Sequence, residues 1–149
     1  MRYQTRAMTL GRIMLVRSSW PAVARQADDL TLRFYSILFD IDPSAARLFS
    51  GVDMEAQRKK LAQALAVVVH ALDDLERLLP PLTALGKRHG NYGVEHHHFD
   101  SVGVALIKAL GEVLRDDFTS ELQAAWAEAY GVVAAVMRRA MLTSQMETA

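Results

Sequence analysis

Cysteine is absent from the 149 residues of this chain. This absence excludes disulfides, thiolate zinc sites, iron–sulfur clusters and thiol catalysis, and it is compatible with the reducing cytoplasm in which we expect the protein. The chain also has no excess charge of either sign, because 17 Lys and Arg residues balance 17 Asp and Glu residues. A balanced charge gives no general attraction to nucleic acid or to an anionic membrane, so neither is expected as a partner.

Long apolar runs are missing as well. The longest, residues 64–72, is interrupted by His70 and is far too short to span a bilayer. Residues 1–8 carry Arg2 and Arg6 with no apolar segment behind them, so we expect a loose tail there and no secretion signal. Hydrophobic residues nevertheless make up 51% of the chain, which is enough for the core of one folded domain.

Strand-like alternation is absent, glycine and proline are few, and apolar residues recur at the helical period. We therefore expect an all-α fold, with one domain over residues 9–141 and a polar C-terminal tail over residues 142–149. Helices should start at capping residues and should stop or kink at prolines. The expected caps are Thr9, Asp28 or Asp29, Asp42, Asp53, and Ser120 with Gln123, and the expected stops are Pro21 and the pair Pro80 and Pro81, with a short helix from Pro81 that Gly90 and Gly93 end.

His89 shares one helix face with Leu82 and Leu85. An imidazole there points into the core and is neutral near pH 7 if buried, and a neutral imidazole nitrogen is a good iron ligand. The alternative is a core histidine satisfied by a hydrogen bond, and the spacing by itself favours that interpretation.

Tyr35 and Gln57 also lie on apolar stripes, Tyr35 before Phe39 and Gln57 one turn before Leu61. Buried polar groups need hydrogen-bond partners, and these are usually backbone groups. The functional interpretation is that the phenol and the amide converge on a bound polar ligand.

Three consecutive histidines, His96, His97 and His98, suggest a metal site. Consecutive side chains point in different directions, however, whereas metal ligands on a helix are spaced i, i+3 or i+4. We expect a solvated loop and a helix start there instead. No Ser/His/Asp arrangement, Gly-rich phosphate loop or paired-carboxylate motif stands out elsewhere.

Eight short motifs follow one another in the order and spacing of a known family. They are Phe34-Tyr35 with Leu38-Phe39, Pro43, Leu48-Phe49, Gln57 with Leu61, Leu85-Gly86-Lys87-Arg88-His89, Tyr92-Gly93-Val94, His98-Phe99 with Val102-Gly103, and Trp126 with Ala129-Tyr130-Gly131. Each motif is weak alone. Together, from about Thr9 to Met141, they resemble the bacterial single-domain globins and the haem domain of flavohaemoglobins.

The resemblance implies a globin fold, with six to eight crossed helices around one b-type haem, a cofactor that needs no cysteine. It implies that His89 is the proximal iron ligand and that Phe49 packs on the haem face. The implied distal wall consists of Tyr35, Gln57 and Leu61, and the implied proximal and rear pocket of Val94, Phe99, Val102 and Trp126. Lys60, three residues after Gln57, could reach a haem propionate or, less readily, the iron.

Two departures from that family are visible. Flavohaemoglobins carry a tyrosine and a glutamate that assist the proximal histidine, and Phe99 and Met141 stand at the matching positions. Weak peroxidase activity is therefore expected. Flavohaemoglobins also continue into a flavin and nicotinamide domain, which does not follow Ala149 here, so an external flavin and NAD(P)H reductase is the expected partner.

The resemblance implies a protein that reversibly binds the diatomic gases O₂, NO and CO. Phenol and amide donors should stabilise the partial negative charge on bound O₂ and slow its release. With an external reductase, such a protein could convert NO to nitrate. The alternatives are a haem-based gas sensor that acts through a separate partner and a haem-free structural globin, and the pair of His89 and Phe49 argues against the latter.

Overall fold

The computed structural model describes residues 8–147, apart from the side chains of Asn91 and of residues 144–147. Over that range the fold is all-α, as expected, with no strand. The helices are α1 (Leu10–Arg25), α2 (Ala27–Ile41), α3 (Pro43–Leu48), α4 (Met54–His70), α5 (Leu75–Asn91), α6 (His96–Leu114) and α7 (Ser120–Glu147), with the 3-10 turn η1 (Arg115–Asp117) between α6 and α7.

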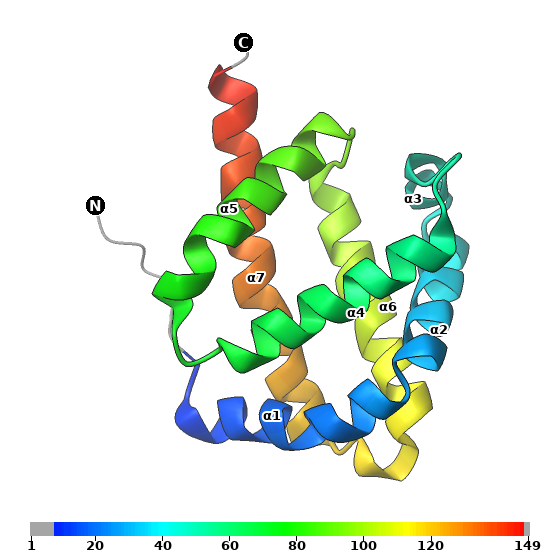
Figure 1. Cartoon of the computed structure of the whole chain (residues 1–149), viewed down its shortest axis with the longest axis vertical. Coiled ribbons are helices and arrows are strands. Elements are labelled where there is room, and N and C mark those ends of the chain that lie inside the picture. Colours follow the sequence, from blue (N-terminus) through cyan, green and yellow to red (C-terminus); the bar gives the residue numbers. More distant parts are fainter. Residues whose placement is uncertain (1–7, 148–149) are drawn as a thin grey trace.

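The helices cross one another instead of lying in a parallel bundle (Figure 1). α5 packs mainly on α7, and α2 packs mainly on α6. α4 crosses in front of α6 and rests on α1 and α2. α4 and α5 barely touch each other, so the two helices belong to separate packing units.

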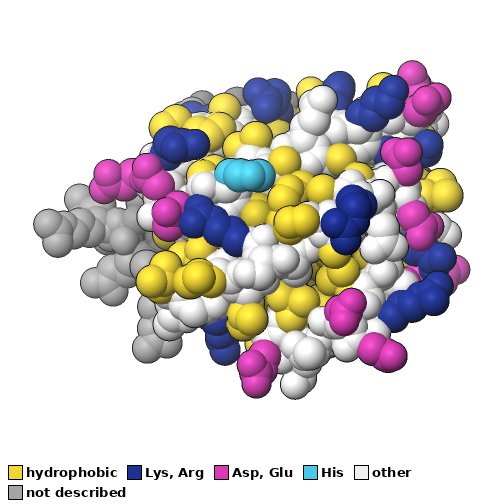
Figure 2. All heavy atoms as spheres, turned by 60° about the horizontal axis from the view of Figure 1, so that its bottom comes forward, with side chains coloured by type: hydrophobic (Ala, Val, Ile, Leu, Met, Phe, Trp, Pro, Cys, Tyr) yellow, Lys and Arg dark blue, Asp and Glu magenta, His cyan; other side chains and the backbone are white. Residues whose placement is uncertain are grey.

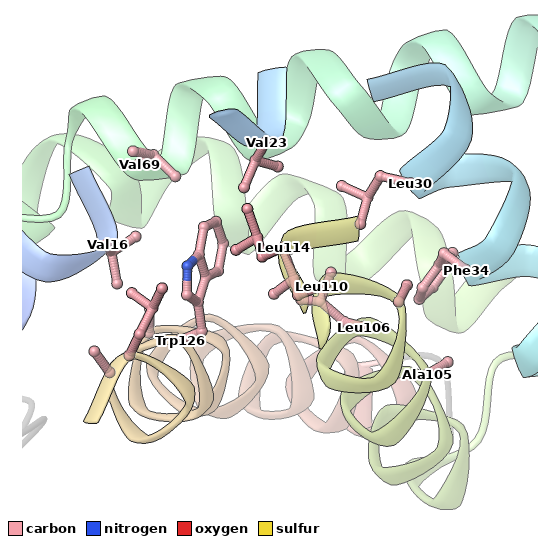
Figure 3. Close-up of a cluster of buried hydrophobic side chains, with 14 of the residues drawn as sticks. Val16, Val23, Leu30, Phe34, Val69, Ala105, Leu106, Leu110, Leu114 and Trp126 are labelled. Carbon is pink, nitrogen blue, oxygen red and sulfur yellow. The ribbon is translucent and has the colours of Figure 1, made fainter. Parts of the chain in front are cut away.

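The core forms two clusters. The first lies between α1, α2, α6 and α7, and Figure 3 shows its side chains, including Val16, Leu30, Leu110 and Trp126, pointing toward one another. The second joins α5 to α7 and consists of Ala71, Leu78, Leu82, Phe99, Ala134, Val136, Met137 and Met141. Each fully buried Leu or Val stabilises the fold by about 1.5–3 kcal/mol, so these clusters hold the crossed helices together.

Two of the expected helix caps are confirmed. Thr9 Oγ1 accepts the backbone N–H of Arg12 at 3.3 Å and starts α1. The Asp53 carboxylate accepts the N–H groups of Glu55 and Ala56 at 3.1 and 3.3 Å and starts α4. These bonds satisfy donors that a helix cannot satisfy internally, which is why the sequence signal was reliable here.

Two other expected caps are wrong. α2 begins directly after Gln26, so Asp28 and Asp29 lie in its first turn, where negative charge suits the helix dipole. The hydroxyl that starts α7 belongs to Thr119, one residue before Ser120, and it accepts the Leu122 N–H at 3.1 Å. Neighbouring Asp, Ser and Thr residues are interchangeable as caps, so the sequence alone does not choose among them.

The expected stop at Pro80 and Pro81 is wrong, and of the two outcomes expected at Pro21, a kink or an end, the helix end does not occur. α1 runs through Pro21, and α5 runs through Pro80 and Pro81, whereas α4 ends earlier, at His70. All three prolines are exposed, so the carbonyl groups that lose a backbone donor can turn to water. Packing of α5 on α7 stabilises the whole helix, and His89 therefore stands near the end of a helix of 17 residues instead of a short one.

The ends of the expected domain shift slightly. Met8 is 7% exposed and belongs to the first core cluster, so packing begins one residue before the expected boundary. The backbone of α7 stays helical to Glu147, beyond residue 141. The rest of the expected tails, residues 1–7 and 148–149, lies outside the described residues. Within the described range, no helix combines the length and apolarity needed to cross a membrane.

α1 anchors the far end of α4. Arg17 donates to the backbone carbonyls of Val69 and His70, at 3.2 and 2.7 Å, and pairs with Asp73 at 2.7 Å. A cation at the C-terminal end of a helix satisfies its free carbonyls. Figure 2 shows this end of the molecule, where apolar side chains lie among charged ones. Arg17 thereby fixes the direction of α4, the helix that carries Gln57 and Leu61.

Candidate functional site

His89 lies in the last turn of α5 and is partly buried. Its Nδ1 lies 2.7 Å from the backbone carbonyl of Leu85, one turn back. A carbonyl only accepts, so Nδ1 carries the proton and Nε2 of the neutral ring keeps a free lone pair. Nε2 has no hydrogen-bond partner among the described residues.

Burial lowers the pKa of His89 below its ordinary 6.5, the bond to the Leu85 carbonyl opposes this shift, and the charge on Arg88 adds to it. The ring is therefore neutral at pH 7, with one fixed tautomer. A neutral imidazole whose second nitrogen is anchored is the form in which histidine binds a metal ion.

Tyr35 and Gln57 lie side by side, and their expected role around a bound polar ligand stays a prediction. Tyr35 comes from α2 and is 6% exposed, and Gln57 comes from the first turn of α4. Gln57 Nε2 donates to the Tyr35 hydroxyl oxygen at 3.2 Å. Burial raises the pKa of Tyr35 above 10, and the bond from Gln57 offsets that in part, so the phenol stays protonated at neutral pH.

Three phenylalanine rings surround the phenol of Tyr35. The Phe49 ring centroid lies 5.3 Å from that of Tyr35, and the Phe39 centroid lies 5.8 Å away. Phe34 packs edge-on against the other side of Tyr35 at 4.9 Å. These rings fix the phenol at χ1 and χ2 and keep its surroundings apolar. Phe49 occupies the C-cap of α3, the turn at which it was expected.

Apolar side chains on α4 and α5 are left partly uncovered. Val69 is the only buried residue of α4, although Leu61, Leu65 and Val68 pack at the edge of the first core cluster. Leu85 on α5 and Val94 after it are likewise only partly buried. Apolar surface of this kind favours a further apolar group, and His89 adds one metal-binding nitrogen. These residues fit a haem, which is flat, largely apolar and holds one iron.

α5 approaches α7 closely beside His89. A Cβ atom on Gly86 would lie 2.5 Å from the Met137 carbonyl oxygen, and one on Gly90 would lie 2.8 Å from Met141 Cγ. The two glycines are spaced i, i+4, a signal of close helix packing that the sequence carried and that was not used. The side of His89 facing α7 is therefore apolar, since Met141 is fully buried and Phe99 belongs to the same cluster.

The other expected pocket residues differ in their placement. Leu61 and Val102 pack on the cluster that contains Tyr35, and Val94 and Phe99 pack on the cluster beside α5. Lys60 is exposed. Trp126 is buried, but its Nε1 donates to Ser19 Oγ at 3.0 Å and its ring lies among Val16, Val23 and Leu114 (Figure 3). These contacts account for Trp126 as a core residue facing α1, and its place in the haem pocket stays a prediction.

The histidine cluster differs most from its interpretation. α6 does begin at His96, and His96 and His97 are exposed as expected, but His98 is 5% exposed and not solvated. The rings of His97 and His98 lie 4.1 Å apart, and both reach Ser44 Oγ, at 3.2 and 2.9 Å. Although their side chains are adjacent in the sequence, both rings converge on Ser44 at the start of α3. Asp42, expected to cap α3, makes no side-chain cap bond and instead accepts from Ser44 and Ser101.

Crossed helices with a free imidazole nitrogen, a phenol–amide pair and uncovered apolar surface define the class of helical haem-binding proteins. A family model named Globin matches residues 32–137. The chain belongs to the globin family, which implies a haem cofactor. Its b-type form, which the resemblance implies and the absence of cysteine agrees with, stays a prediction.

Relatives of two kinds match. A flavohemoprotein from Bacillus cereus is 34% identical over 124 residues, which cover 82% of this chain and 30% of the relative. The chain thus spans about a third of the length of the curated flavohemoproteins that it matches. An anaerobic nitrite reductase from Gossypium hirsutum is 29% identical over 150 residues, covering 91% of this chain and 92% of the relative.

Solved structures agree on the fold. An engineered carbene transferase from Rhodothermus marinus has a TM-score of 0.86 and 28% identity, and covers 95% of this chain and 98% of its own. A bacterial globin from Campylobacter jejuni has a TM-score of 0.81 and 26% identity, with coverage of 93% and 99%. The all-α globin fold expected from the sequence is confirmed.

Proposed function

We propose that this globin holds a b-type haem on His89 Nε2 and reversibly binds O₂, NO and CO, with Tyr35 as the donor to the bound gas. When bound, the haem supplies an iron with one open position for a diatomic ligand. The observation that carries the proposal is the fixed tautomer of His89, whose Nδ1–H bonds Leu85 and whose Nε2 is free.

The hydrogen bond between Gln57 and Tyr35 sets the direction of donation. The Gln57 amide donates to the phenol oxygen, so the phenol's own proton is left for another acceptor. A phenol that stays protonated and is held by three aromatic rings presents that proton at a fixed place. O₂ gathers more negative charge than CO does, so this donor favours O₂.

Conversion of NO to nitrate is the proposed reaction, with electrons from an external flavin and NAD(P)H reductase. The similarity to flavohemoproteins supports this proposal, because the name of those relatives joins a flavin to a haem. Strong retention of O₂ by Tyr35 suits chemistry on O₂ better than bulk delivery. Mixing the O₂-loaded protein with NO should then yield nitrate stoichiometrically, and reductase should make the reaction catalytic.

An absorption spectrum of the purified protein in ferric, ferrous and CO-bound forms tests the haem proposal. We expect a Soret band, and we expect His89→Ala to lose haem or to hold it weakly. Normal haem content with an unchanged ferrous spectrum in that variant would contradict the assignment of His89. A ferrous form that is high-spin and five-coordinate from neutral to alkaline pH would exclude Lys60 as an iron ligand and leave it a propionate partner.

The Tyr35→Phe variant tests the distal donor. O₂ dissociation should speed by about tenfold or more, since a hydrogen bond to a charged acceptor is worth about 1.5–3 kcal/mol. CO dissociation should change little. Tyr92→Phe is the matched control, because Tyr92 is 68% exposed and should affect neither gas. Equal effects of Tyr35→Phe on both gases would show that sterics, and not donation, govern release.

A further inference from the structure

A hydrogen-bonded network outside the candidate haem site joins the end of α2 to the start of α6. The Asp42 carboxylate accepts from Ser44 and, at 2.7 Å, from Ser101. His98 Nε2 lies 2.9 Å from Ser44 Oγ, and His98 Nδ1 accepts the Glu95 backbone N–H at 2.8 Å. Asp42 and His98 are 8% and 5% exposed, so both polar groups depend on these partners.

The backbone fixes the tautomer of His98. A backbone N–H only donates, so His98 Nδ1 carries no proton, and the neutral ring must carry its proton on Nε2. Nε2–H then donates to Ser44 Oγ, and Ser44 donates to Asp42. The network is a one-way series of donors that starts at a backbone amide and ends at a carboxylate.

The direction of these hydrogen bonds argues against a metal ion bound by Asp42 and His98. Ligand atoms of Asp42, His97 and His98 lie within 4.8 Å of one another, which resembles a metal site. A metal bound to His98 Nε2 would require the ring proton to move to Nδ1, where it would face the N–H of Glu95. Binding would cost the helix cap, so the geometry favours a proton-linked role over a metal site.

We propose that this network is a proton-sensitive latch: protonation of His98 breaks the cap of α6 and releases the segment 92–95, which links His89 to that helix. A protonated His98 would carry N–H groups on both ring nitrogens, and the one on Nδ1 would oppose the N–H of Glu95. The capping box, in which Glu95 and His98 each accept a backbone N–H from the other, loses one of its two bonds.

Burial and the neighbouring charged groups determine the pH at which His98 takes up a proton. Burial is the largest influence and lowers the pKa of His98, and a charge on the neighbouring His97 lowers it further. The carboxylates of Asp42 and Glu95 act in the opposite direction. On α7, Arg138 is occupied by Asp100 at 2.7 Å. The folded pKa thus lies below the ordinary 6.5, so the latch is closed above that value and opens as the pH falls beneath it.

The released segment is short and begins three residues after His89, the candidate iron ligand. Val94 N donates to the His89 carbonyl at 3.1 Å, and Gly93 between them has a φ of +86°, a conformation that other residues rarely adopt. Glu95, the next residue, provides the N–H that His98 holds. Loss of that bond therefore loosens the chain immediately after His89.

Amide hydrogen exchange on the full purified chain between pH 8 and pH 5 tests the latch. The protection factors of residues 95–98 should fall by about fivefold to tenfold in acid, the effect expected of a lost helix cap. His98→Gln should abolish the fall, because glutamine accepts at this position of a capping box and does not titrate. His97→Gln is the matched control and should keep the fall, with its midpoint at higher pH. Unchanged protection in the native chain, or a fall that persists in His98→Gln, would overturn the proposal.

Nitrogen-15 NMR of the histidine rings in the native chain gives a readout that needs no variant. Neutral His98 should carry its proton on Nε2 and should titrate below the ordinary value. A proton on Nδ1, or micromolar binding of Zn²⁺ that requires His98, would overturn the assignment. None of these results depends on haem, so a failure here is distinct from a failure of the proposed function.

Discussion

In each key side chain of the candidate site, a hydrogen bond at one atom leaves another atom of the same side chain free. Gln57 donates to Tyr35, and the phenol is left to donate to a ligand. His89 donates to Leu85, and Nε2 is left free for the proposed iron. In both cases a hydrogen bond on one atom determines the chemistry available at another.

The proximal side leads to a prediction about peroxidase activity. A histidine that donates to a carboxylate releases more electron density to iron, which helps to cleave an O–O bond. His89 donates to a neutral carbonyl instead, and Met141 and Phe99, which cannot accept a proton, occupy the positions of the assisting glutamate and tyrosine. The iron–histidine stretching frequency in resonance Raman should therefore be low, with slow peroxidase turnover.

A high stretching frequency together with fast turnover would show that a carboxylate reaches His89. Met141→Glu offers a comparison, because it would place a carboxylate on α7 beside Gly90. If that variant still folds, its frequency should rise above that of the native protein.

At the scale of helices, the contact of α5 with α7 positions His89. Gly86 permits that contact, because its missing side chain would meet backbone atoms of Met137. The Tyr130 hydroxyl group donates to the Phe99 carbonyl at 2.6 Å and links α7 to α6 nearby. α5, α6 and α7 therefore form one packed unit beside His89, the proposed iron ligand.

Substitution of Gly86 measures how much the close contact of α5 with α7 contributes to the stability of the fold. Gly86→Ala should lower the free energy of unfolding by about 1–3 kcal/mol, because backbone must move to admit the methyl group. Gly131→Ala is the control on α7. It meets nothing within 4 Å and should raise stability by about 0.5–1 kcal/mol. Urea unfolding of both variants measures these changes in stability. Equal changes in the two variants would show that α5 and α7 leave room for a methyl group at Gly86.

At the scale of the whole molecule, acid should weaken the fold through Asp42. The hydrogen bonds from Ser44 and then Ser101 lower the pKa of its carboxyl group from 3.8 to about 2. A folded pKa below the unfolded value gives stability that is present above pH 3.8 and is lost as the pH falls through about 2. The free energy of unfolding should therefore drop between these values, and Asp42→Asn should flatten that part of the profile. An identical slope in the variant would assign acid sensitivity to other groups.

Sequence alone determined the helical class and the family, and it singled out the residues of the candidate site. Periodicity predicted α2, α6 and α7, and Thr9 and Asp53 were recognisable as caps because capping depends on a few adjacent residues. His89, Tyr35 and Gln57 could be singled out because each is polar on an apolar stripe, and the bond from His89 to Leu85 follows from spacing within one helix.

Only the tertiary structure decided the features that depend on separate segments. Packing on α7 carried α5 through Pro80 and Pro81, a stabilisation that no local propensity contains. Asp42 and His98 lie 56 positions apart in the chain numbering and come together through Ser44, so one histidine of a cluster expected to be solvated is buried in a hydrogen-bonded network. Burial and hydrogen-bond direction are properties of the assembled fold, and they determine which nitrogen of each histidine carries its proton.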